Sequence, residues 1–364
     1  MTIAAVDFRR QFTPDESKKR IFASVMEKRK ILLIYTGGTI GMKENPLTGA
    51  LENVDFDKVL PEVPELRALD IDIETVTFRK PVDSCDVDAA AWRDMASIIE
   101  DNYSRFDGFV ILHGTDTMAY TASALSFMLE GLQKPVILTG SQLPIGKLRT
   151  DGKENLLTAI EIAAAVREDG LPRVSEVCIF FHDTLTRGNR TTKSSADRFD
   201  AFESFNCKPL AVSAIDIEYD DEAMLRQEGP LKVHYAMDNA MLVLSLFPGI
   251  REDFMRSMLS IPGLKGVVLR TFGSGNAPSF PWLSNVLEDA VRNGLVIVNI
   301  TQCAGGNVAM ERYTTGLHLL GAGVVSGHDS TVEAALTKMM RLFGDGLAAQ
   351  EVRDAMSRSI AGEI

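Results

Sequence analysis

Short apolar runs rich in β-branched and aromatic residues alternate with amphipathic segments of helical length from about residue 30 onwards. Strands separated by helices of about 10 to 15 residues form right-handed βαβ crossovers, which build a parallel sheet with helices on both faces. We therefore expect an α/β protein with a flavodoxin-like parallel sheet in its first domain. Strands are predicted at 31–36, 74–78, 109–112, 135–139 and 177–181, and helices at 89–103, 118–130 and 154–166.

The chain has 364 residues, and at about 150 residues per domain this length favours two domains. The periodic pattern weakens between 216 and 238, where an acidic stretch has no clear period, and then resumes on a smaller scale. Strands are predicted there at 241–247, 266–269 and 295–300, and helices at 252–259, 282–293, 331–343 and 350–359. We predict an N-terminal extension (1–29), a catalytic α/β domain (30–218), a linker (219–238) and a smaller α/β domain (239–364).

The first 29 residues are basic but lack the continuous apolar region and the cleavage site of a signal peptide. Their acidic residues also argue against an organellar transit peptide. Three interpretations stay open: an amphipathic helix, a partner-binding tail, or a consequence of the chosen start codon, since a second methionine follows at Met26.

Charge and cysteine usage exclude several classes of partner. The chain has 38 Lys and Arg against 50 Asp and Glu, a net charge of −12 that repels phosphate backbones and makes nucleic acid a poor partner. Its apolar runs are shorter than the ~18 residues of a membrane span. Four scattered cysteines without a Cys-x-x-Cys pair predict no zinc site and indicate reduced thiols in the cytoplasm.

Ligands of open parallel sheets bind beyond the carboxyl ends of the strands. Here four strand ends carry hydroxyl or carboxylate side chains, and three of the four also contain glycine. They lie at 35–41, 79–86, 113–117 and 139–142. Neither a P-loop nor a G-x-G-x-x-G pattern occurs at these strand ends, which disfavours phosphate binding. The sequence predicts a site at this edge of the sheet.

Each strand-end motif also has a purely structural interpretation. Gly37 and Gly38 fit a tight turn with positive φ, Asp116 fits a helix N-cap, and Asp83 fits an Asx turn after Pro81. Each interpretation is reasonable by itself. Their concentration at one edge of one sheet, together with so many hydroxyl groups, favours a functional site.

Hydroxyls and carboxylates without a histidine are suited to acyl transfer on a small zwitterion. A threonine nucleophile needs a neighbouring base or lysine, and backbone N–H groups near Gly114 can stabilise an oxyanion. Carboxylates can bind an ammonium group, and Ser84 with backbone amides can hold a carboxylate. Lys193 supplies the lysine if it lies beside Asp116, where it would exchange a proton with Thr115. The alternative is a solvated lysine in a basic loop.

Three motifs carry a resemblance to a known family. The segments YTGGTIG (35–41), HGTDT (113–117) and RGNRTTK (187–193) resemble the signatures of bacterial L-asparaginases, and 107–129 is closely similar to the cytoplasmic type I enzymes. The similarity extends from about residue 30 to the C-terminus. It implies hydrolysis of L-asparagine to L-aspartate and ammonia without a cofactor or metal.

The resemblance also implies roles for individual residues. Thr39 matches the nucleophile that forms an acyl-enzyme, and Thr115, Asp116 and Lys193 match the second catalytic group. The residues that match the substrate-holding loop are Asp83, Ser84 and Cys85. The family forms homo-oligomers, so a homodimer or homotetramer is expected, in which Asn276 from a neighbouring subunit completes the site.

Some type I members bind asparagine at an allosteric site between subunits. The matching residues here are Thr192, Arg270, Thr301, Gln302 and Cys303. A buried structural thiol is the alternative interpretation of Cys303.

One departure from the family pattern concerns the segment after the nucleophile. Residues 42–58 read as a lid with possible hinges at Pro46 and Gly49, but they lack the tyrosine that the family usually has there. Without this tyrosine, either another group or water helps to activate the Thr39 hydroxyl, or turnover is impaired. An amino-acid sensor on the same scaffold is therefore a second hypothesis. Glutaminase side activity, or an amidase for another amide, is a third.

Overall fold

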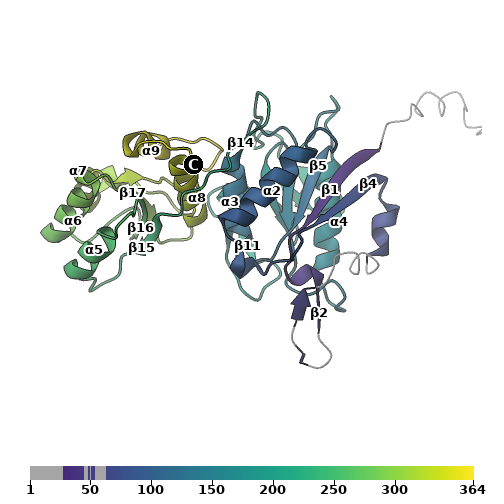
Figure 1. Cartoon of the computed structure of the whole chain (residues 1–364), viewed down its shortest axis with the longest axis horizontal. Helices are drawn as coiled ribbons and strands as arrows, with labels where there is room; N and C mark the ends of the chain where they lie inside the picture. Colours follow the sequence, from purple (N-terminus) through teal and green to yellow (C-terminus); the bar gives the residue numbers. More distant parts are fainter. Residues whose placement is uncertain (1–27, 45–47, 50, 54–62) are drawn as a thin grey trace, which may run out of the picture.

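The computed structural model describes residues 28–44, 48–49, 51–53 and 63–364. Figure 1 shows two α/β units side by side, the N-terminal one the larger. The predicted N-terminal extension lies almost entirely outside the described residues. The sheet of the larger unit has eight strands in the order β13 (Ile217–Tyr219), β12 (Ala211–Ser213), β9 (Thr184–Arg187), β8 (Val177–Phe181), β7 (Val136–Thr139), β5 (Gly108–Leu112), β1 (Arg29–Tyr35) and β4 (Ile71–Thr77).

The sheet is parallel in one part and antiparallel in the other. Five neighbouring strands, β4, β1, β5, β7 and β8, pair in parallel, which confirms the prediction for the strands of the βαβ units. Three further strands that were not predicted, β9, β12 and β13, extend the sheet at one edge and pair antiparallel. Only residues 182–183 separate β8 from β9, with His182 at φ 62°, and so short a connection permits only antiparallel pairing.

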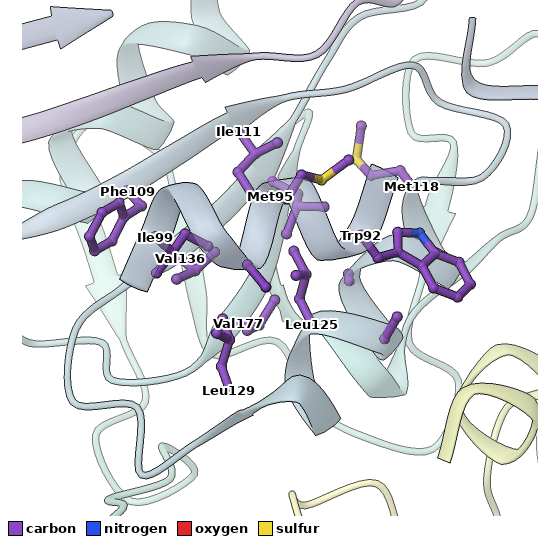
Figure 2. Packing of buried hydrophobic residues seen from close by; sticks show 14 of the residues in the cluster. Trp92, Met95, Ile99, Phe109, Ile111, Met118, Leu125, Leu129, Val136 and Val177 are labelled. Atoms are coloured by element: carbon purple, nitrogen blue, oxygen red, sulfur yellow. The ribbon is translucent and has the colours of Figure 1, made fainter. Parts of the chain in front are cut away.

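Both faces of the large sheet are covered by helices. Helices α2 (Ala89–Asn102) and α3 (Met118–Met128) cover one face. Figure 2 shows Ile99 of α2 near Phe109 of β5, and Met95 of α2 near Ile111. Helix α4 (Gly152–Ala164) covers the other face. Because successive strand residues point to opposite faces, the β-rich runs are apolar throughout, as expected for buried parallel strands.

The end of α3 differs from the prediction. The helix stops at Met128, and the next two residues form the short strand β6 (Leu129–Glu130) before Gly131 at φ 73°. Strand β6 pairs antiparallel with β14 (Lys232–Val233), which lies within the predicted linker. This segment is therefore tied to the end of α3.

The smaller unit has a parallel sheet in the order β15 (Met241–Ser245), β16 (Gly266–Thr271), β17 (Val296–Thr301) and β18 (Val325–Ser326). One face is covered by α5 (Glu252–Leu259), α6 (Pro281–Arg292) and α7 (Thr314–Gly321), and the other by α8 (Val332–Gly344) and α9 (Ala349–Met356). The predicted elements are confirmed, whereas α7 and β18 were not predicted. Helix α8 also packs against α3 and joins the two units.

The predicted lid begins as a β-hairpin. Strands β2 (Met42–Glu44) and β3 (Leu51–Asn53) pair antiparallel, and Gly49 between them has φ 72°. The expected hinge Pro46 lies outside the described residues. In the described parts of the chain, no helix has both the length and the apolar character that crossing a bilayer requires.

Candidate active site

Glycines bring three of the predicted strand-end loops into contact. Gly38 has φ 89°, and a Cβ on it would lie 2.4 Å from the backbone nitrogen of Gly114. A Cβ on Gly37 would lie 2.2 Å from the carbonyl oxygen of Val82. The expected positive φ is confirmed, and the close backbone approach is a second reason for glycine. The following 3-10 turn, Thr39–Gly41, places Thr39 beside the other two loops, half-buried and without a hydrogen bond from its hydroxyl to another described residue.

The loop after β4 is fastened to the start of α3. The Asp83 carboxylate accepts a hydrogen bond from the Cys85 backbone N–H at 3.0 Å, which confirms the expected Asx turn. The Ser84 hydroxyl accepts from the Asp116 N–H at 3.3 Å, and the Ser84 carbonyl accepts from the Thr117 hydroxyl at 2.6 Å. Ser84 is buried and Asp83 is exposed, and the Ser84 hydroxyl, which accepts from the Asp116 N–H, still has its own proton to donate.

Lys193 meets both members of the Thr115–Asp116 pair. It lies on β10 (Thr192–Lys193), and its Nζ is 2.8 Å from Thr115 Oγ1 and 2.7 Å from Asp116 Oδ1. The hydrogen bond from Lys193 lowers the pKa of Asp116, because it stabilises the ionised carboxylate. Because the lysine side chain is only 17% exposed, the alternative of a solvated lysine is wrong. The N-cap interpretation of Asp116 is also wrong, since Thr117 occupies the N-cap of α3.

Gln142 is a residue of this group that sequence reasoning did not assign. Its Oε1 accepts from the Thr115 hydroxyl at 3.4 Å, and its Nε2 donates to the Arg198 carbonyl at 2.9 Å. The Arg198 contact fixes the orientation of the amide and turns the oxygen toward Thr115. Its position could have identified it, because Gln142 belongs to the strand end 139–142, one of the four that the sequence places at the site.

A buried histidine supports the turn that carries Thr115. The His113 Nδ1 lies 2.7 Å from the Gly114 carbonyl oxygen, which can only accept, so Nδ1 carries the proton. The Nε2 then accepts from the Thr121 hydroxyl at 2.9 Å, and that oxygen accepts from the indole N–H of Trp92 at 3.0 Å. This network connects α2, α3 and β5 directly behind the catalytic candidates.

Burial lowers the pKa of His113 to about 4, from an ordinary value of 6.5. The neutral ring therefore stabilises the fold above pH 6.5, and this stabilisation is lost as the pH falls toward 4, because the unfolded chain binds the proton more readily. We expect this group alone to make the free energy of unfolding about 2 kcal/mol lower at pH 5 than at pH 7. Urea unfolding at both pH values measures it. His113→Gln should flatten the dependence, and an unchanged pH dependence in that variant would contradict the assignment.

Asp83, Cys85 and Asp116 are the described residues with the spacing of a possible metal site, since one ligand atom of each lies within 4.8 Å of the others. Two observations disfavour a metal there. Asp116 is already paired with Lys193. The Cys85 thiol donates to Asp116 Oδ2 at 3.3 Å, and the pKa of Cys85 is raised to about 11, mainly by this hydrogen bond, so that the metal-binding thiolate is disfavoured.

The five residues predicted for the allosteric site lie together. Thr192, Arg270, Thr301, Gln302 and Cys303 all line a cavity of about 480 Å³, with Lys193 also at its wall. Cys303 is exposed, so its interpretation as a buried structural thiol is wrong.

Glu333 of α8 is the main residue of this cavity that the sequence did not reveal. It is 7% exposed, and burial raises the pKa of its carboxyl group. Its Oε1 accepts from the Thr192 hydroxyl at 2.7 Å. The Arg270 guanidinium lines the same cavity and makes no hydrogen bond to another described residue. An acidic and a basic group in one cavity of this size suit a small zwitterion.

Asn276 is separate from Thr39 and from the contact group of Thr115, Asp116 and Lys193, which we together call the Thr39 group. It lies in the smaller unit after β16, and its Oδ1 accepts from the Thr315 hydroxyl at 2.8 Å. Within the described chain, none of its hydrogen bonds reaches Thr39 or Lys193.

Comparison with known proteins matches both units. Residues 30–225 match the family described as "Asparaginase, N-terminal", and residues 241–356 match "Glutaminase/Asparaginase C-terminal domain". L-asparaginase 1 of Escherichia coli strain K12 is 44% identical over 346 residues, covering 93% of this chain and 99% of that protein. A 60 kDa lysophospholipase of Mus musculus is 42% identical and matches over 93% of this chain and 63% of its own length.

Solved structures agree with these matches. The crystal structure of L-asparaginase I from Vibrio cholerae has a TM-score of 0.85 and 41% identity, covering 93% of this chain and 99% of that one. The thermostable L-asparaginase from Thermococcus kodakarensis has a TM-score of 0.81 and 32% identity, covering 92% and 99%.

Proposed function

This chain belongs to the L-asparaginase family, and we propose that it hydrolyses L-asparagine to L-aspartate and ammonia with Thr39 as the nucleophile. The observation that supports this mechanism best is the position of Lys193, within 2.8 Å of both Thr115 Oγ1 and Asp116 Oδ1. A hydroxyl, a carboxylate and a lysine in contact form a proton-transfer group beside the Thr39 turn. A protein that only binds an amino acid has no need of such a group.

The reaction proceeds in two steps. The Thr39 hydroxyl oxygen attacks the side-chain amide carbon, the carbon–nitrogen bond breaks, and the hydroxyl proton moves through the Thr115–Lys193 pair to the leaving nitrogen, which departs as ammonia. The aspartyl group stays on Thr39 as an ester. Water then adds to the ester carbon, L-aspartate leaves, and the proton returns to Thr39. The atoms balance without a cofactor.

The exposed carboxylates of Asp83 and Asp116 bind the α-ammonium group of the substrate, and Ser84 with neighbouring backbone N–H groups holds its α-carboxylate. Asp116 is ionised at neutral pH, and the hydrogen bond from Lys193 lowers its pKa further. Backbone N–H groups of the Gly38 and Gly114 turns stabilise the oxyanion that develops on the amide. Cys85 contacts Asp116 and lies within the substrate loop.

Ammonia release from L-asparagine tests the proposal against the sensor hypothesis. The missing lid tyrosine favours the sensor, and the Lys193 contacts favour the enzyme. We expect steady ammonia release by the purified protein. Tight binding of L-asparagine in calorimetry with negligible ammonia would establish the sensor instead.

The choice of amide depends on pocket dimensions, where one methylene group changes binding by only ~1–3 kcal/mol. Steady-state kinetics on L-asparagine and L-glutamine therefore decides between an asparaginase, a mixed activity and an amidase for another substrate. We expect a higher kcat/KM for L-asparagine.

We also propose that the protein works in the cytoplasm as a homodimer or homotetramer, with Asn276 completing the site of a neighbouring subunit. The similarity to E. coli L-asparaginase 1 supports this arrangement, as do the four free cysteines. The predicted boundaries of the catalytic domain at 30–218 and the smaller domain at 239–364 belong to the same proposal.

The cavity beside Lys193 is the proposed allosteric site for L-asparagine. Arg270 would pair with the ligand carboxylate and Glu333 with its ammonium group. We predict a sigmoidal dependence of rate on L-asparagine concentration. Arg270→Met should give a hyperbolic curve with a similar maximal rate, because Arg270 does not contact the Thr39 group. A hyperbolic curve for the unmodified protein would contradict allostery.

A further inference from the structure

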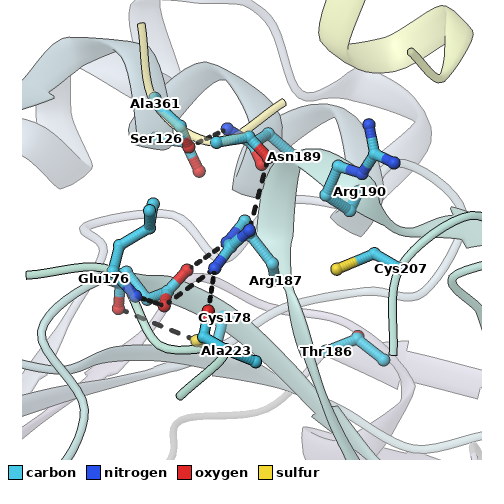
Figure 3. Close-up of polar contacts among 12 residues, drawn as sticks. Ser126, Glu176, Cys178, Thr186, Arg187, Asn189, Arg190, Cys207, Ala223 and Ala361 are labelled. Atoms are coloured by element: carbon cyan, nitrogen blue, oxygen red, sulfur yellow. Dashed lines mark hydrogen bonds and ion pairs between the residues drawn. The ribbon is translucent and has the colours of Figure 1, made fainter. Parts of the chain in front are cut away.

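The segment that carries Lys193 is held by the C-terminal end of the described chain. Three successive carbonyl groups at that end each accept a hydrogen bond from a side chain of 187–190. Asn189 Nδ2 donates to Ala361 at 2.8 Å, Arg187 Nη1 to Gly362 at 3.4 Å, and Arg190 Nη1 to Glu363 at 2.5 Å. Figure 3 shows Asn189 beside Ala361. We call residues 359–363 the C-terminal clamp.

Glu363 fixes the conformation of the clamp. Its side chain is 1% exposed, and its carboxylate accepts from the backbone N–H groups of Ile360 at 3.1 Å and Ala361 at 2.8 Å and from the Ser359 hydroxyl at 3.1 Å. These bonds fold residues 359–363 into a turn whose carbonyls face the other way, toward 187–190. A carboxylate with so many donors holds one defined backbone arrangement.

Lys338 of α8 connects the clamp to the smaller unit. Its Nζ lies 2.5 Å from Glu363 Oε1, and it also donates to the Arg358 carbonyl at 2.6 Å. Both side chains of the ion pair are 1% exposed. A buried ion pair seldom adds much net stability, but removing one partner leaves an unpaired buried charge. The pair is therefore better explained by the geometry that it imposes than by stability.

Other residues of the smaller unit hold the same segment closer to Lys193. Arg190 pairs with both carboxylate oxygens of Asp329, at 2.9 and 2.5 Å, and the Thr192 hydroxyl donates to Glu333. Lys193 comes next in the chain, and its side chain donates to Thr115 in the larger unit. The backbone on which the lysine stands thus depends on contacts from the smaller unit.

We propose that Glu363, held by Lys338, is a positioning residue. Through the C-terminal clamp it fixes the backbone of 187–193 and so the position of Lys193 Nζ relative to Thr115 and Asp116. The inference rests on the proposed catalytic role of Lys193. Displacing a proton-transfer group by about 1 Å costs up to ~100-fold in rate. Glu363 has no contact with the Thr39 group and acts only through 187–193.

The test uses the full chain with the double substitution K338M/E363Q, which removes both charges at similar volume and leaves no unpaired buried ion. We expect kcat for ammonia release to fall ~10- to 100-fold with KM changed less than ~3-fold, because the loops that bind substrate are untouched. Hydrogen exchange followed by mass spectrometry should show faster exchange of the backbone amides of 187–193.

V286A is the matched control, because it removes two methyl groups from the buried face of α6, away from the clamp. It should lower the melting temperature while leaving kcat and exchange at 187–193 unchanged. If the double variant does not fold, Asn189→Ala removes only the Ala361 bond and should give a smaller fall in kcat with the same local increase in exchange.

Two results would overturn the proposal: kcat unchanged in the double variant, or an equal fall in kcat in V286A at a similar melting temperature. Failure of the proposed function looks different. Normal turnover by K193M would remove the lysine from the mechanism, whereas the exchange of 187–193 would still report whether the clamp holds that segment.

Discussion

Replacing Thr39 with Ala is expected to lower kcat for ammonia release by at least ~10⁴-fold, because the variant lacks the oxygen that attacks the amide. The fold should persist. The Thr39 hydroxyl makes no hydrogen bond to another described residue, so its removal leaves no unpaired partner among them, and the loop contacts run through Gly37 and Gly38. The measurement is enzyme-coupled ammonia detection, with the melting temperature as the check on folding.

Thr39→Ser is the matched control for this substitution. It keeps a hydroxyl at the same position and removes only a methyl group, so measurable turnover should remain. Wild-type-like activity in Thr39→Ala would eliminate the nucleophile assignment. Equal loss in both variants would instead mean that the methyl group, rather than the hydroxyl, is essential.

Lys193→Met is expected to lower kcat by about 10³-fold, within the range of general acid–base contributions. The substitution removes the hydrogen bonds to Thr115 Oγ1 and Asp116 Oδ1. The pKa of Asp116 should rise toward its ordinary value in the variant, since the hydrogen bond from the lysine is the main cause of its lowering.

Lys193→Arg separates charge from proton transfer. Arginine keeps the positive charge beside Asp116 but does not release a proton at neutral pH, and its planar fork does not match a single amine position. We expect a loss of turnover close to that of the methionine variant. Near-normal kcat in the arginine variant would show that Lys193 acts by charge alone.

The alternating pattern was enough to predict the parallel part of the fold. Strands β5, β7 and β8 and residues 31–35 of β1 are buried on both faces, so these segments are mostly apolar and stand out in the sequence. The antiparallel strands β9, β12 and β13 were not predicted. Both β12 and β13 are three residues long and partly exposed, and their place in the sheet depends on pairing with distant segments.

The candidate site was predictable where chemistry and sequence position coincide. Thr39, Thr115 and Asp116 directly follow strands, so topology alone brings them to one edge. Gln142 and Glu333 were missed for different reasons. Gln142 lies at a strand end but is uncharged, so its residue type does not indicate a catalytic role. Glu333 lies on α8, and its contact with Thr192 joins residues 141 positions apart, which the sequence alone does not reveal.

The C-terminal clamp has no sequence signature. Glu363 and Lys338 look like ordinary surface charges, and only the packing of the chain end against 187–190 buries them. Hydrogen bonds to backbone carbonyls, such as the one from Asn189 to Ala361, leave no residue-type pattern to recognise. Functional positioning of this kind becomes visible only in three dimensions.

The most direct test of the proposed mechanism is to mix the protein with saturating L-asparagine, quench in acid within the first turnover, and map the peptides by mass spectrometry. The mechanism predicts an aspartyl ester on the peptide that contains Thr39, and no such ester in Thr39→Ala. An ester on the peptide that contains Thr115, or ammonia released in the first turnover without any ester, would contradict it.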